Sequence, residues 1–369
     1  MKEKLAIIRA DIPQQPLILK AKELGIETHC FAWDKDDFND CKNIADYFHP
    51  ISILEKEQIL EKCKEIKIDG ITSITNDFAV TTVAYIAENM RLPGNRYEDM
   101  VIAAGNKFSQ RQAFHEQGVN SPRFAIAREG LDLTEFQYPL IVKPVDRNGS
   151  IGVKKVDNEA ELQKAIQQAQ QVSFSKEVIV EEFVFGCEAT LDMISYQGEH
   201  YPIIISDTEI MGHSDFTKKG YHQPTQLNID IQTKIIAEAK KALDALKFEY
   251  GASDTEVMVT DSGEVKVIEI NPRMGGDATE QLIRLSTGYD FIKGVIDVAL
   301  GQFEKPVFPY KNFSGIHYFS EYTDSIRQTF ENKEYDPNIV KAILFSEEEK
   351  HYGRIGYIMY QSDRKKRWD

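Results

Sequence analysis

The sequence lacks the signatures of several common protein classes. It contains four cysteines, Cys30, Cys41, Cys63 and Cys187, and no Cys-x-x-Cys pair, so we expect reduced thiols in a cytoplasmic protein. No apolar run is long enough to cross a bilayer, and the opening stretch MKEKLAIIRADIPQQP lacks the apolar core of a signal peptide. We therefore predict no membrane partner.

Basic residues are also fewer than acidic residues. The 44 Lys and Arg residues face 59 Asp and Glu residues, which gives a formal net charge of −15. This balance argues against wholesale nucleic-acid binding, although locally gathered lysines can still bind a phosphate ligand. The length of 369 residues suffices for roughly two or three domains, and a homodimer is the default assembly.

The N-terminal part alternates between short apolar strands and helices. Strands are predicted at 4–10, 26–33 and 68–74, and helices at 14–25, 55–67 and 77–90. This alternation favours a parallel sheet in a Rossmann-like α/β domain over residues 1–105. The first strand-to-helix turn, RADIPQQP, has no glycine, whereas dinucleotide-binding folds need G-x-G-x-x-G there to approach a pyrophosphate. A nicotinamide or flavin site is therefore not predicted.

The rest of the chain has α+β character. Helices are predicted at 105–118, 157–171 and 229–247, and an antiparallel pair turns at Gln197-Gly198. The pattern after about residue 302 is mixed and assigns no clear elements.

The stretch VMVTDSGEVKVIEINPRMGGD indicates a hairpin. A two-residue loop at Ser262-Gly263 would place Met258 opposite Val267 and Glu256 opposite Glu269. A three-residue loop with a bulge would shift this register by one residue. Two solvated carboxylates at the open end of a hairpin are about equally compatible with the two glutamates alone.

Asn271 extends this pair of glutamates, because it lies two residues beyond Glu269 and points to the same face. Directly opposed like charges destabilise a sheet, and a hard cation with oxygen ligands removes the repulsion. If Glu256 and Glu269 repel each other, Glu269→Gln should leave the metal-free fold unchanged or slightly more stable, by roughly a few tenths of a kcal/mol.

A second group of residues has the chemistry of a phosphate and nucleoside site. Lys143 ends an apolar strand and is followed by a loop with Gly149, Ser150 and Gly152, whose backbone N–H groups could bind an anion. This is not a P-loop, and an ordinary hairpin loop remains the alternative at about two to one. The strand that contains Glu181 and leads to Glu188 could pair with a purine edge and accept ribose hydroxyls, or it could be an edge strand with solvated glutamates.

Taken in order, these residues resemble the ATP-grasp superfamily, and within it the carboxylate–amine ligases, with most similarity to L-amino-acid ligases. The stretch VIEINPRMGGD is the most specific part of the resemblance. The resemblance implies a two-subdomain ATP-grasp fold after the N-terminal domain: a small subdomain with connecting helices over 106–182, a large subdomain with a metal site over 183–301, and a C-terminal part over 302–369 packed with the large subdomain.

The resemblance also implies roles for individual residues. Arg273 would be catalytic, facing the transferred phosphoryl group. Glu256, Glu269 and Asn271 would bind Mg²⁺, with Mn²⁺ as an alternative. The residues implied in ATP binding are Lys107, Lys143, Asn148, Gly149, Ser150, Ile151, Glu181, Glu182, Phe183, Val184, Glu188 and Met258.

The implied substrates are a small carboxylate, an amino acid or a similar acid, and an amine. The candidate substrate residues are His213, Lys218, His222, Asp254, Gly275 and Gly276. Asp254 stands where the amino-acid ligases often carry a histidine. ATP would activate the carboxylate as an acyl phosphate, and the amine would displace phosphate to form an amide. The alternatives are an ATP-grasp phosphotransferase, a carboxylase that uses bicarbonate, and a nucleotide-binding protein without catalysis.

Overall fold

A parallel sheet forms the N-terminal part of the computed structural model, which describes residues 2–35, 39–128, 133–210, 216–320, 329–331, 336–346 and 353–366. The strand order is β3-β2-β1-β4, and every pair is parallel, as the alternation of elements predicts. The strands are β1 Lys4–Ile8, β2 Glu27–Phe31, β3 Tyr47–His49 and β4 Gly70–Thr72.

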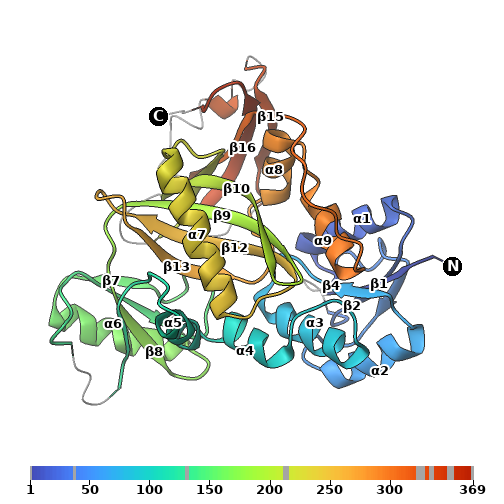
Figure 1. Cartoon of the computed structure of the whole chain (residues 1–369), viewed down its shortest axis with the longest axis horizontal. Coiled ribbons are helices and arrows are strands. Elements are labelled where there is room, and N and C mark those ends of the chain that lie inside the picture. Colours follow the sequence, from blue (N-terminus) through green and yellow to red (C-terminus); the bar gives the residue numbers. More distant parts are fainter. Residues whose placement is uncertain are drawn as a thin grey trace.

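Helices cover both faces of this sheet, and β1 is accordingly apolar and buried from Leu5 to Ile8. Ala6 and Ile8 face α2 (Lys56–Ile66) and α3 (Asp77–Met90). Leu5 and Ile7 face the other side, where the core contains α1 (Gln15–Glu23), which follows the short 3-10 helix at Ile12–Gln14, and α9 (Phe291–Ala299). Helix α9 comes from far along the chain, and Figure 1 shows it beside α1 and β4.

A second, small sheet follows two connecting helices, α4 (Tyr97–Gly105) and α5 (Lys107–Glu116). Its antiparallel order is β5-β8-β6-β7, and α6 (Glu159–Val172) packs on one face. The strands are β5 Phe124–Ile126, β6 Leu140–Pro144, β7 Lys154–Val156 and β8 Val178–Glu182.

The third sheet is the largest, with the order β13-β12-β9-β10-β11-β14-β16-β15. Helix α7 (Ile229–Ala245) packs on β9, β12 and β13, and α8 (Thr279–Thr287) packs near β14. The strands are β9 Cys187–Tyr196, β10 Glu199–Ile210, β11 Lys218–Gln223, β12 Gly251–Val259, β13 Val265–Asn271, β14 Phe313–Ser320, β15 Ile339–Leu344 and β16 Arg354–Ser362.

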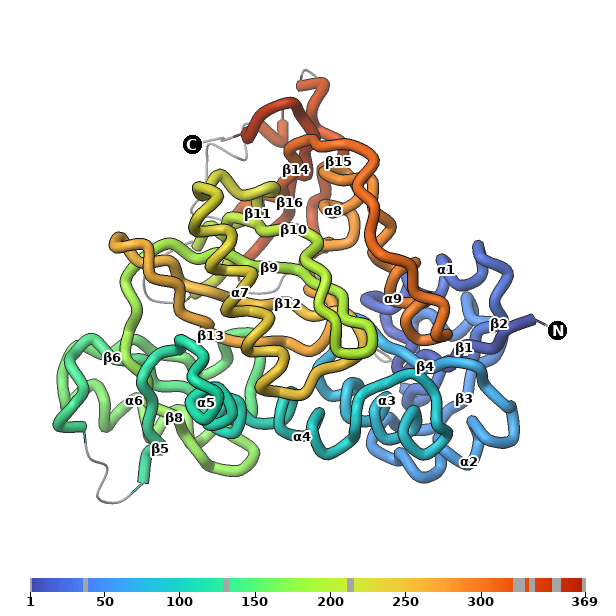
Figure 2. Tube along the Cα trace, viewed as in Figure 1, coloured from blue at the N-terminus to red at the C-terminus, as the bar shows by residue number. Residues whose placement is uncertain are grey.

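The chain after residue 302, to which the sequence assigned no elements, supplies three strands of this large sheet. Strand β14 pairs with β11, and β16 then lies between β14 and β15. Figure 2 shows these C-terminal strands at the upper end of the molecule, continuous with β10 and β11. The C-terminal part is thus integrated with the large sheet by backbone hydrogen bonds.

The three sheets are tied together by polar and apolar contacts. Asn95, in the segment before α4, donates to the carbonyl of Tyr250 at 2.6 Å and accepts the backbone N–H groups of Glu249 and Tyr250 at 2.7 and 2.9 Å. The core between α1 and α9 also contains Ile194 of β9 and Ile204 of β10. No helix within the described ranges has both the length and the apolarity needed to cross a membrane.

The hairpin of β12 and β13 contains two deviations from the predicted register that cancel. Val257 pairs with Val267, and Met258 pairs with Lys266 rather than with Val267, because the loop is one residue longer than predicted. A bulge at Ile268 then restores the register, so that Glu256 does lie opposite Glu269. The predicted pairing of Met258 is wrong, and that of the two glutamates is confirmed.

Candidate active site

A large cleft lies between the small sheet and the β13 side of the large sheet, and it encloses about 1370 Å³. Figure 1 shows the small sheet, marked by β7 and β8, beside β13 of the large sheet. All the residues implied in ATP binding and all three implied metal ligands line the cleft, together with Arg273, Lys218, Asp254 and Gly276. Segments between residues 107 and 276 therefore converge on one site.

Two lysines lie together on the wall formed by the small sheet. Lys107 is the first residue of α5. The preceding residue, Asn106, caps the helix, because its side chain accepts the N–H groups of Phe108 and Ser109. The backbone N–H of Lys107 donates to the carbonyl of Val145 at 2.8 Å, just beyond β6, which carries Lys143. The helix start and the strand end are thereby joined, and both ammonium groups reach the cleft.

Glu181 holds Lys143 in place. The Glu181 carboxylate is 3% exposed and lies 2.7 Å from Nζ of Lys143 and 2.8 Å from Nε of Arg111. Burial raises the pKa of this carboxyl, but Arg111 and Lys143 more than offset the effect, and its pKa lies below the usual range. An unpaired buried charge costs several kcal/mol, so the three side chains depend on one another.

Glu269 faces a cation, and this overturns the expected repulsion between the two glutamates. Its carboxylate lies 2.5 Å from Nζ of Lys107. Burial alone would raise the pKa of Glu269, but Lys107 and Lys143 lower it to about 2. Across the pair, Glu256 lies 3.8 Å from Nζ of Lys218. Glu256 shares Lys218 with Glu188, which forms the shorter ion pair with that lysine. Glu269 has Lys107 as its partner, so Glu269→Gln removes an attraction instead of relieving a repulsion.

The donor set of this region fits a hard divalent cation. Glu256 and Glu269 are cross-strand partners, and Asn271 follows on the same face of β13. All three line the cleft and present oxygen atoms, the ligand type that Mg²⁺ prefers. Lys107 stabilises the Glu269 carboxylate in its charged form, which is the form that binds a metal.

Arg273 lies between the hairpin and the N-terminal domain. Its Nε is 3.0 Å from Asp77 of α3, and its Nη1 is 3.3 Å from Asp254 of β12. Asp77 also accepts from the side chain of Asn148 at 2.8 Å, so the loop after β6 is tied to the same carboxylate. The guanidinium is thus oriented by two carboxylates in a cleft that can admit an anion.

A small acidic cavity of about 30 Å³ adjoins the cleft. Asp192 of β9 and Asp254 of β12 are cross-strand neighbours, and both carboxylates line this cavity. Within the described part of the chain, one oxygen of each carboxylate is buried without a hydrogen-bond partner. Burial and the neighbouring carboxylate raise the pKa of Asp192 well above its usual range, and burial raises the pKa of Asp254 to about 7.

Two of the described candidate substrate residues, His222 and Gly275, do not line the cleft. His213 lies outside the described residues. His222 is fully buried on the opposite face of the large sheet, because its neighbour Tyr221 lines the cleft and side chains alternate along β11. Gly275 lies next to Asp254, because a Cβ atom at Gly275 would come within 3.2 Å of the Asp254 carboxylate, but Gly275 does not itself line the cleft.

Four residues of the site were missed in the sequence. Arg111 lies one helical turn after Lys107, a spacing that could have identified it. Asp77 and Asp192 carry no local signal, because their roles come from pairing with distant segments. Arg354 also lines the cleft and lies 2.9 Å from Asp277.

Comparison with known proteins agrees with this geometry. Residues 136–281 match the ATP-grasp domain family. Alanine–anticapsin ligase of Bacillus amyloliquefaciens is 30% identical over 302 residues, which cover 72% of this chain and 63% of the relative. A D-alanine–D-alanine ligase of Pseudomonas putida is 28% identical over 207 residues, which cover 53% of this chain and 63% of the relative.

A solved structure extends the similarity to the whole chain. The L-amino acid ligase from Bacillus licheniformis superimposes with a TM-score of 0.83 and 24% identity, covering 98% of this chain and 94% of that chain. Residues 136–281 therefore match the ATP-grasp domain, as the hairpin motif implied, and the chain as a whole shares the fold of the L-amino acid ligase. The chain spans 63% of the length of the two curated relatives named above.

The variant Glu269→Gln tests the ion pair and the metal site together. Because Lys107 loses its charged partner, we expect the metal-free protein to lose about 1–3 kcal/mol of unfolding free energy. Nucleotide-dependent turnover should fall by at least about 100-fold, since a metal ligand is also lost. Urea unfolding without magnesium and phosphate release measure the two effects.

The control for this variant is Glu264→Gln at the closed end of the same hairpin. Glu264 is 47% exposed and lies 3.8 Å from Lys266, so both quantities should remain close to those of the wild type. Equal behaviour of the two variants would contradict the assignment of Glu269.

Proposed function

We propose that this chain is an ATP- and Mg²⁺-dependent ligase that activates a small carboxylate as an acyl phosphate and joins it to an amine, releasing ADP and phosphate. One observation carries the proposal: a single cleft contains a buried and a partly buried lysine, an oxygen-donor triad and an oriented arginine. A protein that only bound nucleotide would not need all three features. The names of the relatives support the same class of reaction.

Phosphoryl transfer depends more on positioning and charge neutralisation than on a covalent group of the enzyme. Lys107 and Lys143 would bind phosphate oxygens, and Arg111 and Glu181 would keep Lys143 in position. Glu256, Glu269 and Asn271 would hold Mg²⁺, which neutralises phosphate charge when bound. Arg273 would orient the reacting carboxylate or the transferred phosphoryl group.

The acidic cavity supports an amino acid as one substrate. A cavity of about 30 Å³ can hold a group the size of water, and an ammonium group is of that size. Asp192 and Asp254 would accept its hydrogen bonds, and Arg273, 3.3 Å from Asp254, would bind a carboxylate of the same molecule. Alanine occurs in the names of both curated relatives.

The loop that contains Asn148, Gly149 and Ser150 would cover the bound phosphates and shelter the acyl phosphate from water. The exposed positions Gly149 to Ile151 form its tip, whereas Arg147 is anchored by stacking 3.6 Å from the ring of Phe174. This arrangement supports a lid with a fixed base and a free tip.

The main test is the dependence of ATP hydrolysis on both substrates. Amino acids supplied in pairs with Mg-ATP should give phosphate release that requires a carboxylate and an amine together, with one amide formed per phosphate. A phosphorylated product without amine-dependent phosphate release would indicate a phosphotransferase. Release that requires bicarbonate in place of an organic acid would indicate a carboxylase.

The variant Asp192→Asn tests the acidic cavity. Because the amide cannot ionise opposite a bound ammonium group as the carboxyl group can, we expect kcat/KM for the amino-acid substrate to fall by about 10- to 100-fold, while the KM for ATP changes little. The matched comparison uses the substrate acid without its amino group, for which the variant and the wild type should have similar kcat/KM. An equal loss for both acids would contradict ammonium recognition.

A further inference from the structure

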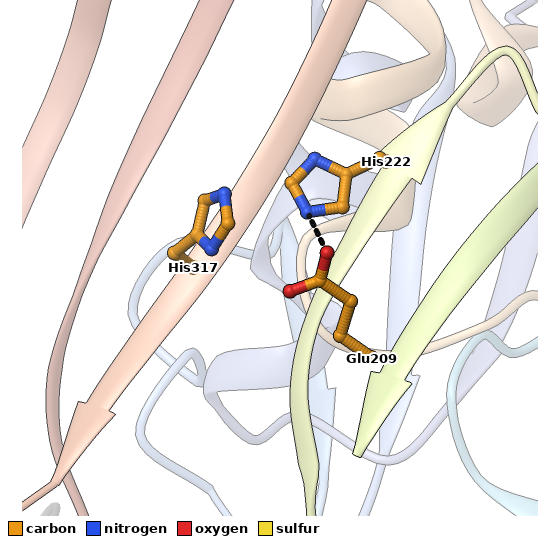
Figure 3. A group of neighbouring side chains, drawn as sticks. All are labelled: Glu209, His222 and His317. Carbon is orange, nitrogen blue, oxygen red and sulfur yellow. Dashed lines mark ion pairs between the residues drawn. The ribbon is translucent and has the colours of Figure 1, made fainter. Parts of the chain in front are cut away.

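Three adjacent strands of the large sheet bring one carboxylate and two imidazoles together. Glu209 lies on β10, His222 on β11 and His317 on β14, and one donor atom of each lies within 4.8 Å of the others. Figure 3 shows the three side chains around one common space. Both histidines are buried and Glu209 is half-buried, so the carboxylate side gives access to solvent.

Glycines make room for the two imidazole rings. His222 lies opposite Gly315 across the β11–β14 pair, and His317 lies opposite Gly220. A Cβ atom at Gly315 would lie 2.7 Å from Nδ1 of His222, and a Cβ atom at Gly220 would lie 2.4 Å from a backbone oxygen of β14. The two strands therefore approach closely, and the ring centroids of His222 and His317 are 4.4 Å apart.

The separation of the Glu209 and His222 donor atoms fits a tetrahedral metal site. Nε2 of His222 lies 3.3 Å from Oε1 of Glu209. In tetrahedral zinc sites with bonds of about 2.0–2.1 Å, ligand atoms are separated by about 3.3 Å. The other ring nitrogen of His222 is 2.9 Å from the hydroxyl of Tyr360. Such an outer contact orients a metal-binding imidazole.

One positive charge opposes a cation at this position, because Lys219 lies near both Glu209 and His317.

We propose that Glu209, His222 and His317 form a binding site for a divalent transition metal, for which zinc is the best chemical match. Two imidazoles and one carboxylate are typical zinc ligands, whereas magnesium prefers oxygen ligands alone. The site lies on the face of the sheet opposite the cleft. Bound zinc joins β10, β11 and β14, and it braces the C-terminal strands without taking part in the ligase reaction.

Calorimetric titration of the metal-free full-length protein with zinc chloride tests the proposal. Millimolar magnesium is kept present to occupy the oxygen-donor site in the cleft. We expect one zinc ion per chain, bound at micromolar concentration or below. Glu209→Gln and His317→Gln should each weaken this binding by at least tenfold, since each removes one of three ligands.

The matched control is His200→Gln. His200 is also a buried histidine beside a carboxylate, 3.2 Å from Asp244, but it lies outside the cluster and the variant should bind zinc as the wild type does. Unchanged zinc affinity in both cluster variants, or no stoichiometric zinc uptake by the wild type, would overturn the proposal.

Cobalt(II) gives a second readout that does not rely on the stability of the variants. Wild-type protein loaded with cobalt(II) should show the strong visible absorption of a four-coordinate site. Glu209→Gln should lose this band, and His200→Gln should keep it. A spectrum of fully hydrated cobalt in the wild type would also overturn the proposal.

Discussion

Charge compensation among partly and fully buried side chains is the interaction on which the cleft depends. Glu181 forms ion pairs with both Arg111 and Lys143, and Glu269 forms an ion pair with Lys107. Without these pairs, each buried charge would cost several kcal/mol. The pairs keep the two lysine side chains in position before a ligand binds. When phosphate groups replace the carboxylates as their partners, the lysine side chains therefore lose little further conformational freedom.

The same principle connects the three sheets. Arg273 extends from the end of the hairpin to Asp77 of the N-terminal domain, and Asp77 holds Asn148 of the loop beside the small sheet. One carboxylate therefore links all three parts of the molecule at the point where the reacting groups would meet. Helix α9 adds an apolar connection, because it packs against the N-terminal sheet while its neighbours in sequence belong to the large sheet.

Local patterns in the sequence predicted the parts of the structure that local physics determines. The N-terminal alternation gave the parallel sheet, and the hairpin motif gave the facing pair of Glu256 and Glu269. The register near the turn was not predictable, because a longer loop and a bulge at Ile268 compensate for each other. That Glu256 and Glu269 each have a lysine partner depends on Lys107 and Lys218, which lie on other elements.

Contacts over long sequence separations were beyond the reach of sequence patterns. Asp77 and Arg273 are 196 residues apart, and no local motif marks the former. The three C-terminal strands were not assigned because their sequence pattern is mixed. One of them, β14, pairs with β11 and contributes His317 to the histidine cluster. His222 was predicted to contact the substrate because it lies in a polar segment of the sequence. The alternation of side chains along β11 instead places it on the face of the large sheet opposite the cleft.

The acyl phosphate is the central element of the proposed chemistry, and isotope transfer tests it most directly. The substrate acid is labelled with ¹⁸O in its carboxylate and supplied with Mg-ATP and the amine. If a carboxylate oxygen attacks the γ-phosphate and the amine then displaces phosphate from the acyl carbon, each released phosphate carries one ¹⁸O atom from the acid. Mass spectrometry of the phosphate should show this transfer in equal number to the amide formed. Amide formation with unlabelled phosphate would contradict the account.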